Sequence, residues 1–515
     1  MSTSTLRTPP ISEIYDIAVI GGGINGVGIA RDAAGRGLRV LLVERDDLAG
    51  HTSSASTKLI HGGLRYLEYY EFRLVREALR ERERLLGIAP HIAWPLRFVL
   101  PRPEGGRPGW LIRLGLFIYD RLGGRQTLPR SQAVDLADPR WGAGLRPGLR
   151  RGYAYSDAWV DDARLVVLNA IDAAERGATI LTHTAFTGAR VDGDAWLAEL
   201  ATAHGAQSLR ARVIVNAAGP WVADIIDGLP GVRREGGVAL VKGSHIIVPR
   251  LYPGDHAFLL QQPDGRIVFT IPYQHRYTLI GTTDVVVGQA ERAAPRITLA
   301  EVDYLCAAVS PYFTQAVTPA SVIATYSGVR SLHDDGKADA KAITRDYVLQ
   351  LGRAAGPQVL SVLGGKLTTY RRLAEHALAK LAPWLPEGGP AWTASAPLPG
   401  GDLPPGGFAA FLGQVRARWP FLPPDVSERM AHAYGTRLAA IIGAASAWDQ
   451  LGEDFGSGLT EAELRYLADH EWAACADDVL WRRTKLGLAA PPDLAERVAG
   501  WFAARAIGKG ERAGA

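Results

Sequence analysis

Three glycines near the N-terminus, followed by an acidic residue, have the spacing that binds a dinucleotide. Gly21, Gly23 and Gly26 fit the pattern G-x-G-x-x-G, and Glu44 stands roughly 20 residues further on. Glycines let the backbone approach a pyrophosphate closely, and the N-terminus of a following helix offers unpaired N–H groups. Glu44 can accept a hydrogen bond from a ribose 2′-hydroxyl but would repel a 2′-phosphate, so NADP is disfavoured. The pattern does not separate FAD from NAD, because both use the same geometry.

The segments around these residues predict a β-α-β unit. Residues 15–20 predict a buried strand, residues 25–36 a helix, and residues 39–43 a second buried strand that ends at Glu44. Soon afterwards, residues 52–58 form a run of small hydroxyl side chains that ends in a lysine. Such a run suits an extended ligand such as FAD, and it suits a solvated loop equally well.

Further segments of the same α/β layer recur downstream, which indicates a discontinuous nucleotide-binding domain. They are a helix over 161–176 and short buried strands over 179–181, 212–215 and 359–363. Strand-like stretches separated by turn residues predict a mostly antiparallel sheet, over 245–248, 267–270 and 277–280. We therefore expect an α/β protein with a Rossmann-like domain, an antiparallel substrate domain and an all-α C-terminal domain. The predicted boundaries are 13–100, 150–236 and 350–386 for the Rossmann-like domain, 101–149 and 237–349 for the substrate or cap region, 387–407 for a Pro/Gly-rich linker, and 408–515 for the helical domain.

Composition excludes several other classes of protein. The chain has 515 residues and a formal net charge of +4, which gives no indication of nucleic-acid binding. Its two cysteines cannot form a disulfide framework or a cysteine metal cage, and we expect no metal site. Residues 1–12 are polar and predict no secretory signal. No stretch approaches the ~20 apolar residues of a membrane span.

Beyond the glycine pattern, the sequence resembles the aerobic, FAD-dependent glycerol-3-phosphate dehydrogenases along essentially its whole length. The most specific match is residues 52–67, TSSASTKLIHGGLRYL. Further matches follow in the family's order, at 152–153, 156–165 (SDAWVDDARL), 216–221 (NAAGPW), 242–245 (KGSH), 281–284 (GTTD), 326–330 (YSGVR), 344–347 (TRDY), 364–370 (GGKLTTY), 469–472 (DHEW) and 480–484 (LWRRT). One departure is Ser331, where bacterial members of the family usually carry proline.

The resemblance implies that the Rossmann-like domain binds FAD and that the enzyme oxidises glycerol-3-phosphate to dihydroxyacetone phosphate by hydride transfer to flavin N5. The expected FAD contacts are Gly21, Gly23, Asn25, Gly26, Glu44, Thr52, Ser53, Ser54, Ser56, Gly219, Gly364, Gly365, Leu367 and Thr368. A phosphate dianion requires fixed cations and hydroxyl donors. The resemblance places around the substrate Arg65, Tyr66, Arg330, Arg345, Lys366 and Thr369.

Removal of the hydroxyl proton requires a base whose pKa lies near neutrality. His61 and His245 lie inside the matched segments, and we favour them as the base without ranking them. Lys366 is a third candidate if neighbouring arginines depress its pKa.

The resemblance further implies that electrons pass to ubiquinone or another membrane quinone. Residues 110–119 mix aromatic and aliphatic side chains with an arginine, which is typical of a bilayer interface and also of a core helix. We expect a cytoplasmic protein bound peripherally to the inner membrane, with a homodimer as one possibility. The alternatives are a glycerol-3-phosphate oxidase that uses oxygen, and a flavin amine or amino-acid oxidase.

Overall fold

A largely parallel sheet carries the glycine-rich segment in the computed structural model, which describes residues 14–102, 108–124, 127–334, 346–352 and 356–513. Strand β1 (Ile14–Ile20) lies between β2 (Val40–Val43) and β10 (Gly205–Asn216), and all three run parallel. Apolar residues occupy almost every position of β1 and β2 because both faces of the sheet are covered. The predicted β-α-β unit is confirmed.

The remaining strands of this first sheet come from distant parts of the chain; those at 179–181 and 359–363 were predicted, and the other three were not. The strand order is β17-β18-β10-β1-β2-β7, and a β8–β9 hairpin pairs with β10. Their bounds are Thr179–Leu181 for β7, Ala185–Asp192 for β8, Ala195–Thr202 for β9, Val348–Leu351 for β17 and Val359–Leu363 for β18.

Three helices pack side by side on one face of the first sheet. Helix α1 (Ile24–Gly35) begins directly after Gly23 and packs between α5 (Asp162–Glu175) and α8 (Tyr370–Leu381). Their buried aliphatic side chains form one core with β1, β2 and β10. The short helix α6 (Val222–Asp227) contacts β10 and β18.

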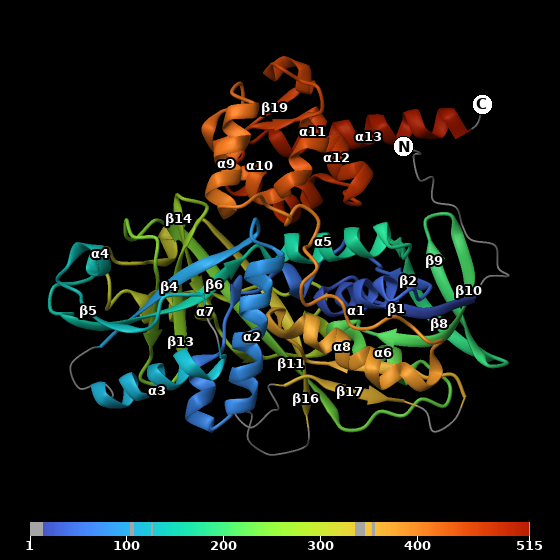
Figure 1. Ribbon diagram of the computed structural model, residues 1–515, viewed down its shortest axis with the longest axis horizontal. Helices are drawn as coiled ribbons and strands as arrows, with labels where there is room; N and C mark the ends of the chain where they lie inside the picture. Colours follow the sequence, from blue (N-terminus) through green and yellow to red (C-terminus); the bar gives the residue numbers. More distant parts are fainter. Residues whose placement is uncertain (1–13, 103–107, 125–126, 335–345, 353–355, 514–515) are drawn as a thin grey trace.

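A second, mostly antiparallel sheet lies beside the first (Figure 1). Its order is β15-β11-β14-β13-β12-β4-β6-β3, with β16 paired to β11 and β5 paired to β6. The bounds are Leu59–Ile60 (β3), Ala93–Pro101 (β4), Gln132–Asp135 (β5), Arg151–Val160 (β6), Gly237–Pro249 (β11), Ala257–Gln261 (β12), Ile267–Tyr273 (β13), Tyr277–Gly281 (β14), Val285–Val286 (β15) and Ala324–Asp334 (β16). Strands β3, β4 and β6 fall within the ranges predicted for the FAD-binding domain, yet they pair in this sheet. The division into domains therefore stays a proposal.

The C-terminal helices form a unit with its own apolar core, which lies above α5 in Figure 1. The helices are α9 (Gly407–Arg418), α10 (Pro424–Tyr434), α11 (Leu438–Ile442), α12 (Glu461–His470) and α13 (Leu494–Ala513). A short hairpin of β19 (Asp454–Gly456) and β20 (Leu459–Thr460) is the one addition to the predicted all-helical pattern in the described residues. The six residues Asp478–Arg483 form a π-helix that contacts α5.

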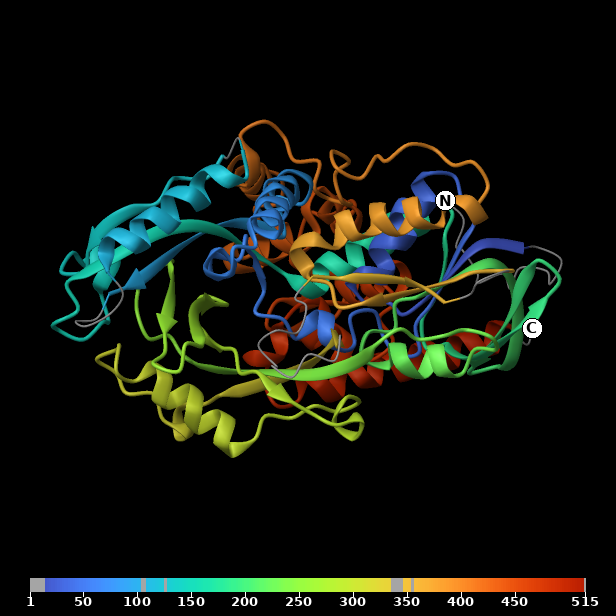
Figure 2. The ribbon, with the colours of Figure 1, turned by 90° about the horizontal axis from the view of Figure 1, so that it is seen from below.

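Helix α3 (Gly109–Leu122) confirms the helical pattern expected around residues 110–119. In Figure 1 it lies at the lower edge of the molecule, on the opposite side from the C-terminal helices, and Figure 2 shows it at the outer side of the second sheet. The remaining helices are α2 (Phe72–Ile88), α4 (Pro139–Gly142) and α7 (Leu299–Val309). In the described part of the chain, no helix combines the length and the apolar character that crossing a bilayer requires.

Candidate active site

The glycine-rich turn between β1 and α1 is shaped by close backbone contacts. Gly21 has φ +111°, and a Cβ atom there would stand 2.5 Å from the carbonyl oxygen of Ala217. A Cβ on Gly26 would stand 1.9 Å from the carbonyl oxygen of Gly21. Gly21 and Gly26 are therefore required by the turn itself, which brings the start of α1 directly against the end of β1.

Glu44 lies at the end of β2, where its buried carboxylate closes the turn. Its Oε2 accepts a hydrogen bond from the Gly22 N–H at 2.6 Å, and its Oε1 accepts one from the Asp46 N–H at 2.9 Å. Burial raises the pKa of Glu44, and the two backbone hydrogen bonds oppose that effect. The carboxylate also lines the adjoining cavity.

A cavity of about 440 Å³ extends from this turn to the loop after β18. The predicted cofactor or substrate residues that line it are Gly21, Gly23, Asn25, Glu44, Thr52, Ser53, Gly219, Arg330, Gly364 and Gly365. Asn25 joins the two ends, because its Nδ2 donates to the Gly364 carbonyl oxygen at 3.1 Å. Its Oδ1 is buried and has no hydrogen-bond partner within the described residues. The cavity thus offers a polar atom ready to receive a donor.

The hydroxyl side chains of residues 52–56 point in different directions. Ser53 faces the cavity and accepts a hydrogen bond from the Ile24 N–H of α1 at 3.0 Å. Ser54 instead lines a second cavity, and Ser56 donates to Asp162 at 2.7 Å. The structure therefore places Thr52 and Ser53 in the main cavity, and it places Ser54 and Ser56 elsewhere. The reason for Ser56 is local: Asp162 accepts hydrogen bonds from both its N–H and its hydroxyl group.

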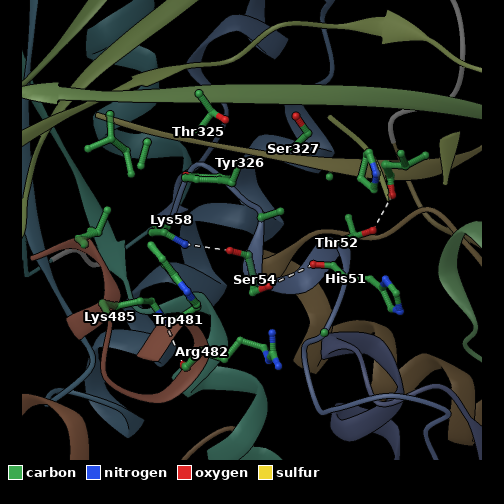
Figure 3. A pocket seen from close by; sticks show the side chains of 18 of the residues that line it. His51, Thr52, Ser54, Lys58, Thr325, Tyr326, Ser327, Trp481, Arg482 and Lys485 are labelled. Atoms are coloured by element: carbon green, nitrogen blue, oxygen red, sulfur yellow. Dashed lines mark hydrogen bonds between the residues drawn. The ribbon is translucent and has the colours of Figure 1, made fainter. Parts of the chain in front are cut away.

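The second cavity, of about 340 Å³, lies next to the first (Figure 3). Gly50, His51, Thr52 and Val329 line both. Its other walls are residues 324–328 of β16 and the C-terminal segment that carries Trp481, Arg482 and Lys485, among others. Residues far apart in sequence therefore meet around the hydroxyl run.

Lys366, Tyr66 and His61 form a group beyond the loop after β18. The Lys366 Nζ lies 4.2 Å from the centre of the Tyr66 ring. The His61 N–H donates to Thr368 Oγ1 at 3.3 Å. Burial lowers the pKa of His61; the charge of Asp157 opposes this, and that of Lys366 adds to it. Four predicted residues are thus brought close to one another.

His245 is buried on β11, with its ring stacked on Tyr326 at 4.7 Å between centres. Its Nε2 is 2.9 Å from Thr57 Oγ1, whereas its Nδ1 has no hydrogen-bond partner in the described parts of the chain. Burial lowers the pKa of His245 to about 3, aided by the charges of Lys58 and Arg330. The imidazole is therefore neutral at neutral pH and can accept a proton.

The predicted phosphate cations are only partly assembled. Arg65 lies beside the Tyr69 ring, and Arg330 forms an ion pair with Asp284 while lining the main cavity. Each of these two arginines therefore already has a partner of its own. Arg345 lies outside the described residues. Thr369 is half-buried just before α8, and Leu367 packs against the core of the first sheet.

Three residues near this site received no role from the sequence. Thr57 contacts His245, and Lys58 forms a buried ion pair with Asp162 at 2.7 Å. All three lie inside the matched segments, but only the fold shows what they contact. A lysine that ends a run of small hydroxyl residues is the one signal that could have singled out Lys58.

Two models of known protein families match most of the chain. A family model described as FAD dependent oxidoreductase matches residues 16–371. The chain belongs to this family. A second model, described as the C-terminal domain of alpha-glycerophosphate oxidase, matches residues 391–506.

Named relatives cover nearly the full chain of this FAD-dependent oxidoreductase. A glycerol-3-phosphate dehydrogenase of Pseudomonas aeruginosa is 52% identical over 96% of both chains. A D-erythritol 1-phosphate dehydrogenase of Brucella abortus is 50% identical over 92% of this chain and 94% of the relative. A solved glycerol-3-phosphate dehydrogenase of Bacillus halodurans, complexed with FAD, is 27% identical with a TM-score of 0.75, over 96% of this chain and 91% of the other.

The main cavity fits the FAD that defines the family. Gly21, Gly23 and the N-terminus of α1 suit a pyrophosphate, and the orphaned Oδ1 of Asn25 offers an acceptor beside them. Gly364 and Gly365, at the far end of the cavity, have φ values of +77° and +100°, a left-handed conformation that favours glycine. When bound, FAD supplies the acceptor for a hydride, and the protein supplies position and charge.

Proposed function

We propose that this enzyme oxidises glycerol-3-phosphate to dihydroxyacetone phosphate and passes the electrons to a membrane quinone. The observation that carries the proposal is the group of Lys366, Tyr66 and His61, which follows the loop at the far end of the FAD cavity. A cation, a phenol and a neutral histidine are the groups needed to hold a phosphate and to remove a hydroxyl proton. The names of relatives that are about half identical support the same substrate.

In this mechanism, the chain's own residues perform two tasks. Lys366 holds the phosphate, and Tyr66 and Thr369 donate hydrogen bonds to it. The family resemblance adds Arg65, Arg330 and Arg345 as further cations for the phosphate. His61 or His245 accepts the hydroxyl proton, and bound FAD would supply the acceptor for the hydride from C2. Burial keeps each imidazole neutral and therefore able to accept a proton, but the pKa of about 3 makes His245 a weak base. Lys366 remains a third candidate for the base.

D-erythritol 1-phosphate is the second candidate substrate, because the Brucella abortus relative named for it is 50% identical. It presents a terminal phosphate like that of glycerol-3-phosphate on a longer polyol. The phosphate-holding residues would accept either compound, so the length of the pocket beyond the reacting carbon decides between them.

We further propose that the protein binds the cytoplasmic face of the inner membrane peripherally, and exposed side chains on α3 support the lipid contact. Trp110, Leu111, Leu114 and Phe117 expose 69%, 44%, 47% and 52% of their surface. Arg121 stacks on the Phe117 ring with its guanidinium carbon 3.5 Å from the ring centre. Apolar and aromatic groups next to a cation are the composition that lies in a lipid interface. A quinone acceptor and a homodimer are part of the same proposal.

The test compares substrates and acceptors with one preparation of the purified protein. We expect glycerol-3-phosphate to reduce a soluble quinone analogue with a higher kcat/KM than D-erythritol 1-phosphate, and with little hydrogen peroxide formed in air. Preference for D-erythritol 1-phosphate would transfer the assignment to that substrate. Stoichiometric peroxide would indicate an oxidase, and turnover of amino acids alone would refute the phosphate assignment.

A further inference from the structure

Side chains of the C-terminal domain form hydrogen bonds with the loop that lines the FAD cavity. Asp47, which lies just after β2 and is 3% exposed, receives two hydrogen bonds from Arg483, both at 2.7 Å. Arg482 donates a third at 2.6 Å. Two successive arginines of the π-helix thus hold one buried carboxylate. Short π-helical segments are unusual and often occur at functional sites.

The same C-terminal segment also holds the far end of this loop. Lys485 Nζ lies 3.2 Å from Asp161 Oδ1 at the start of α5. The adjacent Asp162 accepts two hydrogen bonds from Lys58, at 2.7 and 2.9 Å, and one from the Ser56 hydroxyl. In Figure 3, Trp481, Arg482 and Lys485 lie on the side of the second cavity opposite Thr325 and Ser327, while Lys58 and Ser54 lie between. Residues 47–58 are therefore fixed at both ends.

The residues between these two ends are the ones that face FAD. Gly50, His51, Thr52 and Ser53 line the cofactor cavity. Ala49 has φ +59°, a left-handed conformation that costs free energy for a residue other than glycine, and its N–H donates to the Gly22 carbonyl oxygen at 3.2 Å. A strained turn of this kind persists only when its surroundings hold it. Besides the hydrogen bond of Ala49 to Gly22, the contacts of the Asp47 carboxylate with Arg482 and Arg483 hold this turn from two residues earlier.

We propose that Arg483 is a positioning residue for FAD: acting through Asp47, it keeps residues 47–53 against the glycine-rich turn. The C-terminal domain thereby takes part in cofactor retention, although in the described residues none of its side chains lines the FAD cavity. Arg483 suits this role because its side chain is completely buried and its guanidinium also donates to the Glu471 carbonyl oxygen at 2.6 Å. Two hydrogen bonds from one planar group fix the direction of Asp47 as well as its distance.

The experiment measures the release of FAD from the full-length holoenzyme after dilution, by the recovery of free flavin fluorescence. Arg483→Gln should raise the FAD dissociation constant by about tenfold or more, the loss expected for a buried charge-assisted contact. Arg483→Lys keeps the charge but not the paired hydrogen bonds, so its FAD dissociation constant should lie between those of the unmodified protein and Arg483→Gln. The double variant Asp47→Asn/Arg483→Gln should lose little more than Arg483→Gln, because the two residues act as one unit.

Arg437→Gln is the matched control. Arg437 also joins the C-terminal domain to α5, through Glu175 at 2.6 Å, but it contacts the opposite end of that helix from the loop. Its FAD dissociation constant should equal that of the unmodified protein. Equal weakening in Arg437→Gln and Arg483→Gln would overturn the proposal, because the effect would then come from domain docking in general. Normal retention in Arg483→Gln would overturn it as well. If Arg483→Gln fails to fold, the partly exposed Arg482→Gln should still release FAD about threefold faster, and an unchanged rate would count against the proposal.

Discussion

Replacing Gly26 by alanine tests whether the glycine-rich turn is built for close backbone packing around a pyrophosphate. The new Cβ atom would stand 1.9 Å from the Gly21 carbonyl oxygen, whereas ordinary contacts begin at 3.4 Å. The start of α1 must therefore move away from β1 by more than 1 Å, on the scale of that overlap. Overpacking of this kind costs about 1–3 kcal/mol. If the shift displaces the N–H groups that face the cavity, that cost corresponds to an FAD dissociation constant raised by roughly 5–150-fold.

The assay is the ratio of FAD to protein after dialysis, together with the Tm of the same samples. Gly87→Ala is the control, because Gly87 lies in α2 and a Cβ there meets nothing within 4 Å. That variant should keep its FAD and gain stability of about 0.5–1 kcal/mol. If Gly26→Ala retained full FAD at an unchanged Tm, the inferred geometry of the turn would be refuted.

The remaining predictions concern the base, the phosphate and the lipid surface. His61→Asn or His245→Asn should lower kcat by about 10²–10⁴-fold at unchanged FAD content, and the variant that keeps its rate excludes that residue as the base. Burial lowers the pKa of both histidines from the ordinary value of 6.5, so the base is still neutral at pH 6.5. As the pH falls, kcat/KM should therefore decline only when the pH reaches the lowered pKa of the base. Loss of activity already above pH 6.5 would contradict this. Lys366→Met should raise KM for glycerol-3-phosphate by about 10–100-fold, and Lys366→Arg should recover part of that loss. Trp110→Ser and Phe117→Ser together should weaken sedimentation with anionic vesicles by about tenfold or more, since each buried aromatic contributes about 1.5–3 kcal/mol; unchanged sedimentation would exclude α3 as the lipid contact.

The sequence predicted the parts of the fold that depend on local pattern. The β-α-β unit could be predicted because buried strands, a glycine turn and an acidic residue follow one another within a short segment. The strands of the second sheet over 245–248, 267–270 and 277–280 could be predicted because strand-like stretches are separated there by turn residues. Strands β4 and β6 were not predicted, and they pair in the second sheet although most of their residues fall in ranges proposed for the FAD-binding domain, because period and composition do not indicate which sheet a strand joins.

The direction of individual side chains at the site could not be predicted. Ser53 and Ser56 belong to one run of similar residues, yet Ser53 faces the cofactor cavity and Ser56 faces Asp162. Which of them turns inward depends on Asp162, which is distant in sequence. The pairing of Arg483 with Asp47 depends in the same way on how the C-terminal domain packs on the first sheet. Such contacts are set by tertiary structure and leave no local signal.

The most direct measurement of the central claim is an anaerobic titration of the purified yellow protein with glycerol-3-phosphate, followed by flavin absorbance. The account predicts that the visible flavin band bleaches as substrate is added and that dihydroxyacetone phosphate forms in proportion to the FAD reduced. A colourless protein without FAD would contradict it, and so would flavin that stays oxidised in excess glycerol-3-phosphate.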